Sequence, residues 1–222
     1  IKAGGGTGGS RSLTAQGMAI VDASDLVIEK GKAYAAHVFE AAKADITFQD
    51  GTFRVAGTDR AIPIMELAAK AKTITIPGVE GGLDAHADIK LDAWTFPNGC
   101  HIAEVEIDPD TGVVEIVDYN VVDDFGVVNP MLVEGQVHGG VVQGIGQALF
   151  ERTVYDSAGQ LVTGSFTDYC IPRADNVPSF GFSTVEVPCK NNGMGVKGCG
   201  EAGTVGSPAA VINAIVDALQ PL

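Results

Sequence analysis

Residues 102–122, Ile-Ala-Glu-Val-Glu-Ile-Asp-Pro-Asp-Thr-Gly-Val-Val-Glu-Ile-Val-Asp-Tyr-Asn-Val-Val, contain two β-type runs around one turn signal. The turn is Pro109-Asp-Thr-Gly112, with proline and glycine in the places where tight turns favour them. This stretch therefore predicts a β-hairpin that joins Ile102–Asp108 to Val113–Val122.

Two further stretches show the same hairpin signature. Residues 46–55 alternate polar and apolar side chains on both sides of Asp50-Gly51, a pair that tolerates the positive φ angles of a two-residue turn. Residues 151–169 contain Asp156-Ser-Ala-Gly159, which predicts a third hairpin. Residues 182–187 predict one last short strand.

Helical patterns separate these hairpins. Apolar residues recur at near-helical spacing over residues 12–42, and shorter patterns follow at 64–71 and 130–149. Ser207-Pro208 is expected to open a C-terminal helix with one apolar face. Because hairpins and helices are segregated, the sequence predicts an α+β fold with antiparallel β-hairpins and packed helices.

The connection at residues 73–99 is rich in Gly, Pro and Asp and holds the single tryptophan, Trp94. A structureless segment of this length inside a compact domain is more often functional or interfacial than idle. We expect an irregular connection here. The whole chain, 1–222, then forms one domain that this connection divides into two possible subdomains.

The predicted helix at 130–149 begins with Asn129 as N-cap and Pro130 at the first position. Its interior carries five glycines, which together cost on the order of 5 kcal/mol relative to alanine. Two compensations are possible, namely close packing against another backbone or the approach of a bulky ligand. The sequence leaves both open. The glycines are Gly135, Gly139, Gly140, Gly144 and Gly146.

Composition excludes several classes of partner. The chain has 222 residues, 45% of them hydrophobic, and 28 acidic against 14 basic residues give a formal net charge of −14. Nucleic acid and anionic membranes are therefore poor partners. The longest apolar run, 127–150, is too polar for lipid because Glu134 and His138 interrupt it, so no membrane span is expected.

Four cysteines, Cys100, Cys170, Cys189 and Cys199, form no C-x-x-C pair, which predicts reduced thiols in a cytoplasmic protein and no metal cluster or disulfide framework. The first residues lack an initiating Met and the apolar core of a signal peptide. We therefore expect the chain to be part of a longer one.

Two stretches satisfy G-x-G-x-x-G, at Gly4-Gly6-Gly9 and Gly198-Gly200-Gly203. Neither shows the strand before and the parallel strand after that a dinucleotide fold needs, so each motif alone is weak. Glycine-rich backbone before a helix still offers N–H groups to an anion such as phosphate. A flexible chain end is an equal alternative for the first motif. A nucleotide-binding protein, for NAD or ATP, stays a third hypothesis.

A single carboxylate, Glu201, lies among the glycines of residues 193–203. A carboxylate that acts as a base needs a dry site to raise its pKa and room for a reactant at about 3 Å. The glycines predict that room. Nearby Lys197 is expected to stabilise an anionic ligand, to hold the loop, or to be simply solvated.

Three stretches, taken together, resemble the molybdenum hydroxylase family, which includes xanthine dehydrogenases, aldehyde oxidoreductases and carbon monoxide dehydrogenases. They are Gly-Gly-Ser-Arg-Ser at 8–12, residues 122–149 from Val-Asp-Asp-Phe-Gly to Gly-Gln-Ala-Leu, and Lys-Gly-Cys-Gly-Glu-Ala-Gly at 197–203. The similarity runs in order through nearly the whole chain. The chain thus resembles the C-terminal molybdopterin-binding domain of the large subunit.

The resemblance implies that Glu201 is the catalytic general base, taking a proton from the hydroxyl ligand of molybdenum so that its oxygen can attack an electron-poor carbon. It also implies two cofactor-binding segments, with the metal held by the pterin and not by protein residues. The residues that this assigns are Gly8, Gly9, Ser10, Arg11, Ser12, Lys197, Gly198 and Gly200. Gln136, His138, Gly139 and Gly140 match strongly, and their only expected role is close approach of the helix to the cofactor.

By the same resemblance, the cofactor is molybdopterin with molybdenum, in a cytosine dinucleotide form, and FAD and [2Fe-2S] centres lie on partner subunits or domains. The first half of the large subunit is the other partner, so this chain alone is expected to be inactive. Gly-Glu-Ala-Gly departs from the Gly-Glu-Ser-Pro of carbon monoxide enzymes and the Gly-Glu-Pro-Pro of animal xanthine oxidases, which favours an aldehyde or N-heterocycle as substrate. The alternative is a noncatalytic structural or chaperone-like homologue that binds no cofactor.

Overall fold

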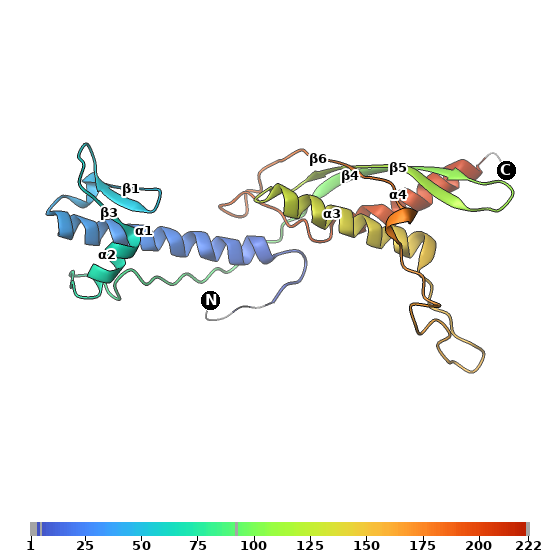
Figure 1. The fold of residues 1–222 in the computed structure, drawn as a ribbon, viewed down its shortest axis with the longest axis horizontal. Helices are drawn as coiled ribbons and strands as arrows, with labels where there is room; N and C mark the ends of the chain where they lie inside the picture. The colour runs from blue at the N-terminus through green and yellow to red at the C-terminus, as the bar shows by residue number, and fades with distance from the viewer. Residues whose placement is uncertain (1–3, 5, 92, 221–222) are drawn as a thin grey trace. The chain divides into compact units, whose positions relative to one another are not determined.

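The computed structural model describes residues 4, 6–91 and 93–220, and these fall into two compact units. One unit is formed by residues 15–90, and the other by residues up to 14 together with those from 91 onward. Both combine helices with antiparallel strands, which confirms the predicted α+β class (Figure 1).

The unit of residues 15–90 packs two helices on a three-stranded antiparallel sheet of order β1-β2-β3. The predicted turn at Asp50-Gly51 forms, with φ of 48° and 71°. Gly31 lies so close to the ring of Phe53 that a Cβ there would be 2.1 Å from Phe53 Cζ. The elements are α1 (Met18–Phe39), which continues from the π-helical turn η1 (Leu13–Gly17), η2 (Lys43–Asp45), β1 (Ile46–Gln49), β2 (Thr52–Val55), β3 (Ala61–Pro63) and α2 (Ile64–Ala71).

The second unit is built on the hairpin of residues 98–124, where β4 (Asn98–Ile107) pairs antiparallel with β5 (Val114–Asp124). The predicted turn closes with a hydrogen bond from Gly112 N–H to Asp108 C=O, 2.8 Å long. On the other edge of β5 lies β6 (Gly181–Thr184), which is parallel to it. The remaining elements are α3 (Pro130–Ile145), η3 (Gly146–Phe150), η4 (Ala174–Asn176) and α4 (Ala202–Leu219).

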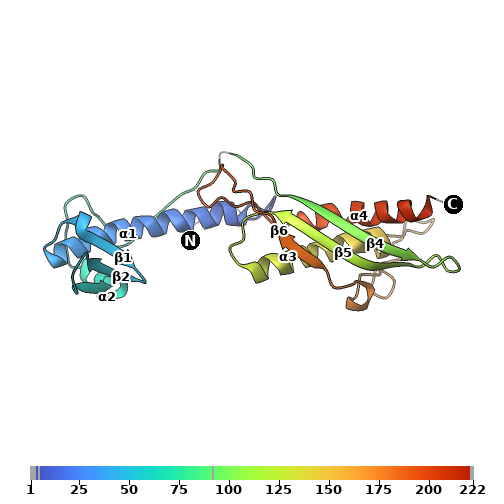
Figure 2. The same cartoon turned by 90° about the horizontal axis from the view of Figure 1, so that it is seen from above.

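Helices α3 and α4 cover the same face of this sheet (Figures 1 and 2). Alternate residues of β5 point into the core, among them Tyr119 and Val121, and the predicted i, i+4 stripe of α3 packs on them. The Asn129 side chain accepts the Leu132 N–H at 3.2 Å, as expected of the N-cap.

The glycines of α3 divide between the two explanations that the sequence left open. A Cβ at Gly140 would lie 2.9 Å from Thr204 N, and one at Gly144 would lie 1.7 Å from Ser207 Oγ, so both glycines bring α3 and α4 into backbone contact. Gly146 is crowded by Pro172 and Glu151. By contrast, Gly135 and Gly139 have no neighbour within 4 Å of a Cβ.

Two sequence predictions need correction. The hairpin predicted at 151–169 is much shorter than expected: the Asp156–Gly159 turn forms and Val162 N–H donates to Val154 O at 2.8 Å, but the β pairing is limited to the isolated bridge Tyr155–Leu161. Helix α4 begins at Ala202, not at Ser207, so that Pro208 lies inside it. The early start is possible because the Gly203 and Gly206 backbones fit against α3 and β4, a tertiary contact that local propensity does not report.

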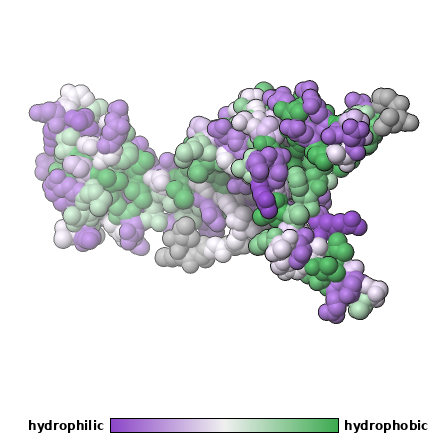
Figure 3. Space-filling view, turned by 45° about the vertical axis from the view of Figure 1, so that its right-hand side comes forward, coloured by the Kyte–Doolittle hydropathy of each residue, from purple (hydrophilic) through white to green (hydrophobic). Residues whose placement is uncertain are grey.

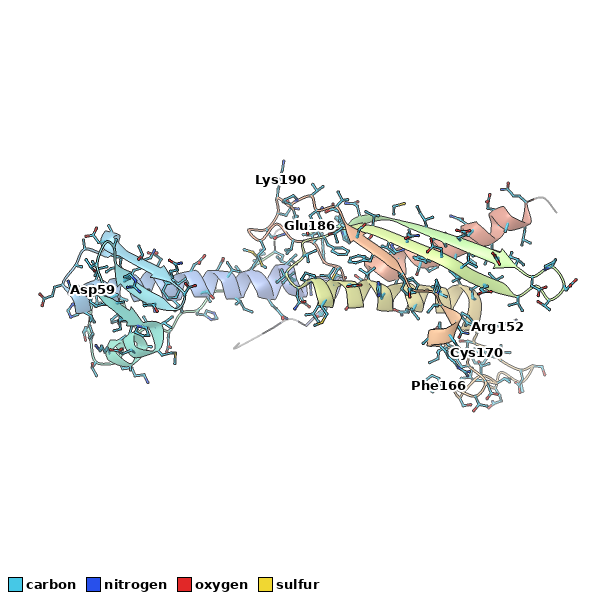
Figure 4. All side chains as sticks on the ribbon, turned by 45° about the horizontal axis from the view of Figure 1, so that its top comes forward. Asp59, Arg152, Phe166, Cys170, Glu186 and Lys190 are labelled. Atoms are coloured by element: carbon cyan, nitrogen blue, oxygen red, sulfur yellow. The ribbon has the colours of Figure 1, made fainter. Side chains whose placement is uncertain are left out.

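The segment 151–173 leaves the end of α3 and projects from the sheet and helices of its unit (Figures 1 and 4). It carries Arg152, Phe166 and Cys170, and Phe166 is 82% exposed. Figure 3 shows apolar and polar side chains mixed on this segment.

Among the described residues, α4 is the one helix long and apolar enough to cross a membrane by length and composition. The sequence prediction of no membrane span considered 127–150 and overlooked this helix. Core helices of globular folds meet the same criterion when they are mostly buried, whereas 17% of α4 is buried, at Gly203, Ser207 and Val211.

Substitution of the two kinds of glycine tests the packing of α3. Gly144→Ala should destabilise the protein by about 1–3 kcal/mol, because its Cβ overlaps Ser207. Gly135→Ala should stabilise it by up to about 1 kcal/mol, because alanine is the better helix former and meets nothing there. Urea unfolding of both variants measures this difference, and equal effects would contradict the contact of α3 with α4.

Candidate functional site

The two segments that the sequence predicts to hold a cofactor and a base lie side by side. Ser10 Oγ donates a hydrogen bond to Glu201 Oε2 at 2.8 Å, across 191 residues of chain. Gly9 and Ser10 both have positive φ, 60° and 55°, and this turn presents the Ser10 hydroxyl. A non-glycine residue with positive φ is uncommon, and such residues cluster at functional sites, so the backbone conformation of Ser10 marks this loop as a candidate site.

The glycines that flank Glu201 make this approach possible. A Cβ at Gly198 would lie 2.0 Å from Ser10 O, and one at Gly200 would lie 2.9 Å from Ser10 Oγ. Any side chain at Gly198 would therefore separate the two segments. The sequence assigned these glycines to room for a reactant, whereas the structure uses Gly198 and Gly200 for contact with the Ser10 loop.

Helix α3 forms the third wall beside Glu201. Gln136 Nε2 donates to Gly200 O at 3.1 Å, which ties the helix to the residue before Glu201. Gly139 follows Gln136 by three residues and so shares its side of the helix, with no side chain to fill the space. His138 instead packs edge-on against Phe180 and Phe182. Its Nε2 is buried without a hydrogen-bond partner among the described residues.

Lys197 is 9% exposed, so the prediction of a solvated lysine at this position is wrong. Its ammonium is bound to the carboxylate of Asp124 at the end of β5. Partial burial opposes ionisation of Asp124, but hydrogen bonds from Lys197 and from Val187 N–H outweigh it and hold the pKa of that carboxyl below its ordinary value. Of the sequence alternatives for Lys197, the structure supports holding the loop.

The other residues of the 8–12 loop lie around Ser10 without touching Glu201. The Arg11 guanidinium lies 6.0 Å from the centre of the Trp94 ring, a cation–π arrangement. Both side chains line a cavity of about 140 Å³ together with Gly9 and Thr14. The Ser12 hydroxyl is hydrogen-bonded to the Thr7 hydroxyl. Gly8 is exposed, and a Cβ added to it would meet no atom within 4 Å.

Glu201 itself is exposed, so the dry site expected of a base is not formed by the residues that the structure describes. No hydrogen bond from the described residues reaches its Oε1, whereas Oε2 accepts from Ser10. The carboxylate is thus held at one oxygen and open at the other. The backbone C=O of Glu201 accepts the N–H of Val205 at 3.0 Å, which fixes Glu201 at the start of α4.

Cys199 is half-buried, and burial raises the pKa of its thiol, with a smaller contribution from the charge of Asp123. A raised pKa makes the thiol a poor nucleophile. In the part of the chain that the structure describes, no group of three or more His, Cys, Asp or Glu side chains could hold a metal ion.

Comparison with known proteins identifies the family to which this fold belongs. Residues 1–178 match the model of the molybdopterin cofactor-binding domain, and the chain belongs to this family. The chain is 40% identical to the nicotine 6-hydroxylase large subunit of Paenarthrobacter nicotinovorans, over 98% of this chain and 27% of that protein. More particularly, it is homologous to large subunits of molybdenum hydroxylases.

Solved structures agree with this assignment. The quinoline 2-oxidoreductase of Pseudomonas putida 86 superposes with a TM-score of 0.86 at 39% identity, over 96% of this chain and 28% of that one. The CO dehydrogenase of Oligotropha carboxidovorans gives a TM-score of 0.87 at 33% identity, over 96% and 27%. The chain spans about a quarter of the length of the relatives it matches.

Asp124 is the site residue that sequence reasoning missed, although it lies inside the resembling block 122–149. Gln136 was singled out in that block, but its contact with Gly200 was not foreseen. For Asp124 a physical signal existed, because a lysine in an apolar glycine-rich segment needs a carboxylate if it is buried. Asp123 and Asp124, consecutive at the end of a predicted strand, were candidates for that role.

The ion pair of Lys197 with Asp124 makes stability depend on pH in a defined direction. Because the pKa of folded Asp124 lies below its ordinary value of 3.8, the pair stabilises the protein above about pH 4 and is lost as the pH falls through the lowered pKa. Asp124→Asn should cost about 1.5–3 kcal/mol at pH 7 and much less near pH 3. Urea unfolding at both pH values measures this, with Asp110→Asn as the exposed control. Equal costs at both pH values would contradict the assignment.

Proposed function

We propose that this chain is part of a molybdopterin-dependent oxidoreductase that hydroxylates a carbon of an N-heterocycle or aldehyde with oxygen from water, with Glu201 as general base. The observation that carries the proposal is the hydrogen bond from Ser10 to Glu201. It joins the loop expected to hold the cofactor to the acid expected to do the chemistry.

The residues present fit the cofactor. A Cβ at Gly8 would meet nothing within 4 Å, so the backbone of this glycine-rich loop is open to a ligand, and backbone N–H groups suit the phosphates of a pterin dinucleotide. Gly198 and Gly200 keep the second segment against this loop. We infer from the family resemblance that the metal would be held by the pterin. When bound, the cofactor supplies the two-electron redox chemistry of the hydroxylation. We infer its cytosine dinucleotide form from the family resemblance alone.

The contacts of Glu201 support a part for it in proton transfer. Ser10 fixes the carboxylate through Oε2, and Oε1 is the atom that would accept the proton. Gln136 holds the preceding carbonyl, that of Gly200, so the acid is oriented from two sides. Gly135 and Gly139 leave this side of α3 bare, which gives room for a flat ring. The exposure of Glu201 means that the rest of the enzyme would exclude water from it.

An N-heterocycle is the favoured substrate class. The relatives named for nicotine and quinoline are closer to this chain, at 40% and 39% identity, than the CO dehydrogenase at 33%. The Gly-Glu-Ala-Gly sequence around Glu201 points the same way.

We infer that the rest of a large subunit completes the site, because the chain spans about a quarter of the length of its relatives. We infer also that electrons leave through FAD and [2Fe-2S] centres on partner subunits or domains of a cytoplasmic complex. This chain alone is then expected to be inactive.

Replacement of the base in the full-length holoenzyme tests the role of Glu201. Glu201→Gln keeps the shape and loses the proton acceptor, so kcat should fall by about 10²- to 10⁴-fold while molybdenum and pterin contents stay at the level of the wild type. Glu106→Gln, on the exposed face of β4, is the control and should turn over normally. Full turnover by Glu201→Gln would contradict the proposal. Absence of metal and pterin from the full-length protein would favour the noncatalytic homologue.

Removal of the Ser10 hydroxyl tests its hold on the carboxylate. Ser10→Gly deletes the donor without straining a backbone that already has positive φ, so kcat should fall about tenfold, the worth of one hydrogen bond of about 1.4 kcal/mol. Ser10→Asn, which also accepts positive φ and offers an amide donor, should recover part of the loss. Steady-state kinetics checks both, and unchanged kcat in Ser10→Gly would remove Ser10 from the mechanism.

A further inference from the structure

Strand β5 ends in two adjacent carboxylates, Asp123 and Asp124, whose side chains leave the strand on opposite faces. Asp123 is 3% exposed, and the Asp124 side chain is 15% exposed. Carboxylates are rarely buried to this degree without a specific partner. The partner of Asp124 is Lys197, four residues before Glu201, and the partner of Asp123 is His101, whose ring contacts Gly206, five residues after Glu201.

On one face, Asp124 binds the ammonium of Lys197 and accepts the N–H of Val187 at 2.9 Å. Lys197 lies four residues before Glu201. Between them, Gly198 and Gly200 fit against Ser10, so the backbone of 197–200 is held by the strand at its start and by the loop along its length.

On the other face, Asp123 reaches across Gly99 toward His101. A Cβ at Gly99 would lie 1.8 Å from Asp123 Oδ1, so the space over Gly99 is needed for this carboxylate. His101 Nε2 lies 3.7 Å from Asp123 Oδ1, and His101 Nδ1 is hydrogen-bonded to the hydroxyl of the fully buried Tyr119 at 2.9 Å. The imidazole ring thereby has a polar neighbour at each of its nitrogens.

The His101 ring is the surface on which α4 rests. A Cβ at Gly206 would lie 2.5–2.7 Å from three atoms of the ring, so the helix backbone is in direct contact with it. Gly206 lies five residues after Glu201, within the first two turns of α4. Because a helix transmits displacement along its axis, the position of this ring sets the position of Glu201.

We propose that Asp123 and Asp124 position Glu201 from both sides: Asp124 through Lys197 ahead of it, and Asp123 through His101 and Gly206 behind it. We call these four polar residues, Asp123, Asp124, His101 and Lys197, the strand clamp. This inference rests on the proposed role of Glu201 as a base, and it assigns the clamp no contact with substrate or cofactor.

The cost of the clamp supports a role beyond stability. Asp123 Oδ2 is buried without a hydrogen-bond partner among the described residues. An unsatisfied buried oxygen destabilises the folded state, and more so when it is charged. Apolar side chains in place of buried ion pairs often stabilise a protein, so a sequence shaped by packing alone would favour them here. The polar groups instead hold the segment around Glu201 in one conformation, and a catalytic acid needs a fixed position.

The experiment uses the full-length holoenzyme and loosens each arm separately. Asp124→Asn and His101→Gln retain shape and some hydrogen bonding, whereas Lys197→Met and His101→Ala remove the contact. Lys190→Met is the matched control, because Lys190 is an exposed lysine of the same loop region whose side chain extends away from the body of its unit (Figure 4). Each variant is made alone and together with Glu201→Gln, and molybdenum and pterin are measured in all.

The first readout is kinetic coupling. Lys197→Met and His101→Ala should each lower kcat by about tenfold or more with KM changed by less than about twofold, and His101→Gln and Asp124→Asn should be milder. In the Glu201→Gln background each should lower kcat by less than about twofold further, because residues that act through Glu201 have nothing left to position. Equal losses in both backgrounds would overturn the proposal.

The second readout does not depend on turnover, so it tests the proposal even where a variant is too slow for kinetic measurement. Amide hydrogen exchange in the peptide 198–206 should rise by about tenfold or more in each arm's variants, and stay as in the wild type in Lys190→Met. Unchanged exchange would overturn the clamp. Where Lys197→Met or His101→Ala does not fold, the same two outcomes are measured in Asp124→Asn and His101→Gln. Faster exchange together with full turnover by Glu201→Gln would instead refute the proposed function and retain the clamp as a structural feature.

Discussion

The close approach of α3 and α4 is the constraint on which the rest of this unit depends. Gly140 and Gly203 face one another with no side chain between them, and Thr204 Oγ1 donates to Gly140 O at 3.0 Å. Larger residues would push α4 outward and carry Glu201 away from both Ser10 and Gln136. Glycine lowers the stability of a helix, but at these positions it allows three segments to meet at the Glu201 carboxylate.

Local chemistry made much of the fold predictable. The turns at Asp50-Gly51 and Pro109–Gly112 and the Asn129-Pro130 helix start were found because each depends on the residues themselves. The start of α4 was not, because Ala202 becomes helical only where Gly203 and Gly206 fit against other elements. The hairpin expected at 151–169 is shorter than predicted, since its turn and the bridge Tyr155–Leu161 form but no longer ladder extends along the flanks.

The site divides in the same way. Glu201 and the 8–12 loop were singled out from sequence and resemblance, and the structure places Ser10 against Glu201, as a shared site requires. What could not be foreseen was the use of each neighbour. Lys197 turns to Asp124, Arg11 lies over Trp94, and Gly198 and Gly200 make room for backbone. These roles depend on contacts between residues far apart in the chain, which the spacing of residues in a sequence does not predict.

Pro208 gives α4 an unusual mechanical division. Proline has no N–H, so the carbonyl of Thr204 receives no bond from the turn that follows, and the ladder of the helix is interrupted one turn after Glu201. The Thr204 hydroxyl is bonded to α3 at the same level. The opening turn of α4 therefore lacks one lengthwise hydrogen bond at the residue where it gains a sideways bond to α3, so Thr204 links the start of the helix to its neighbour.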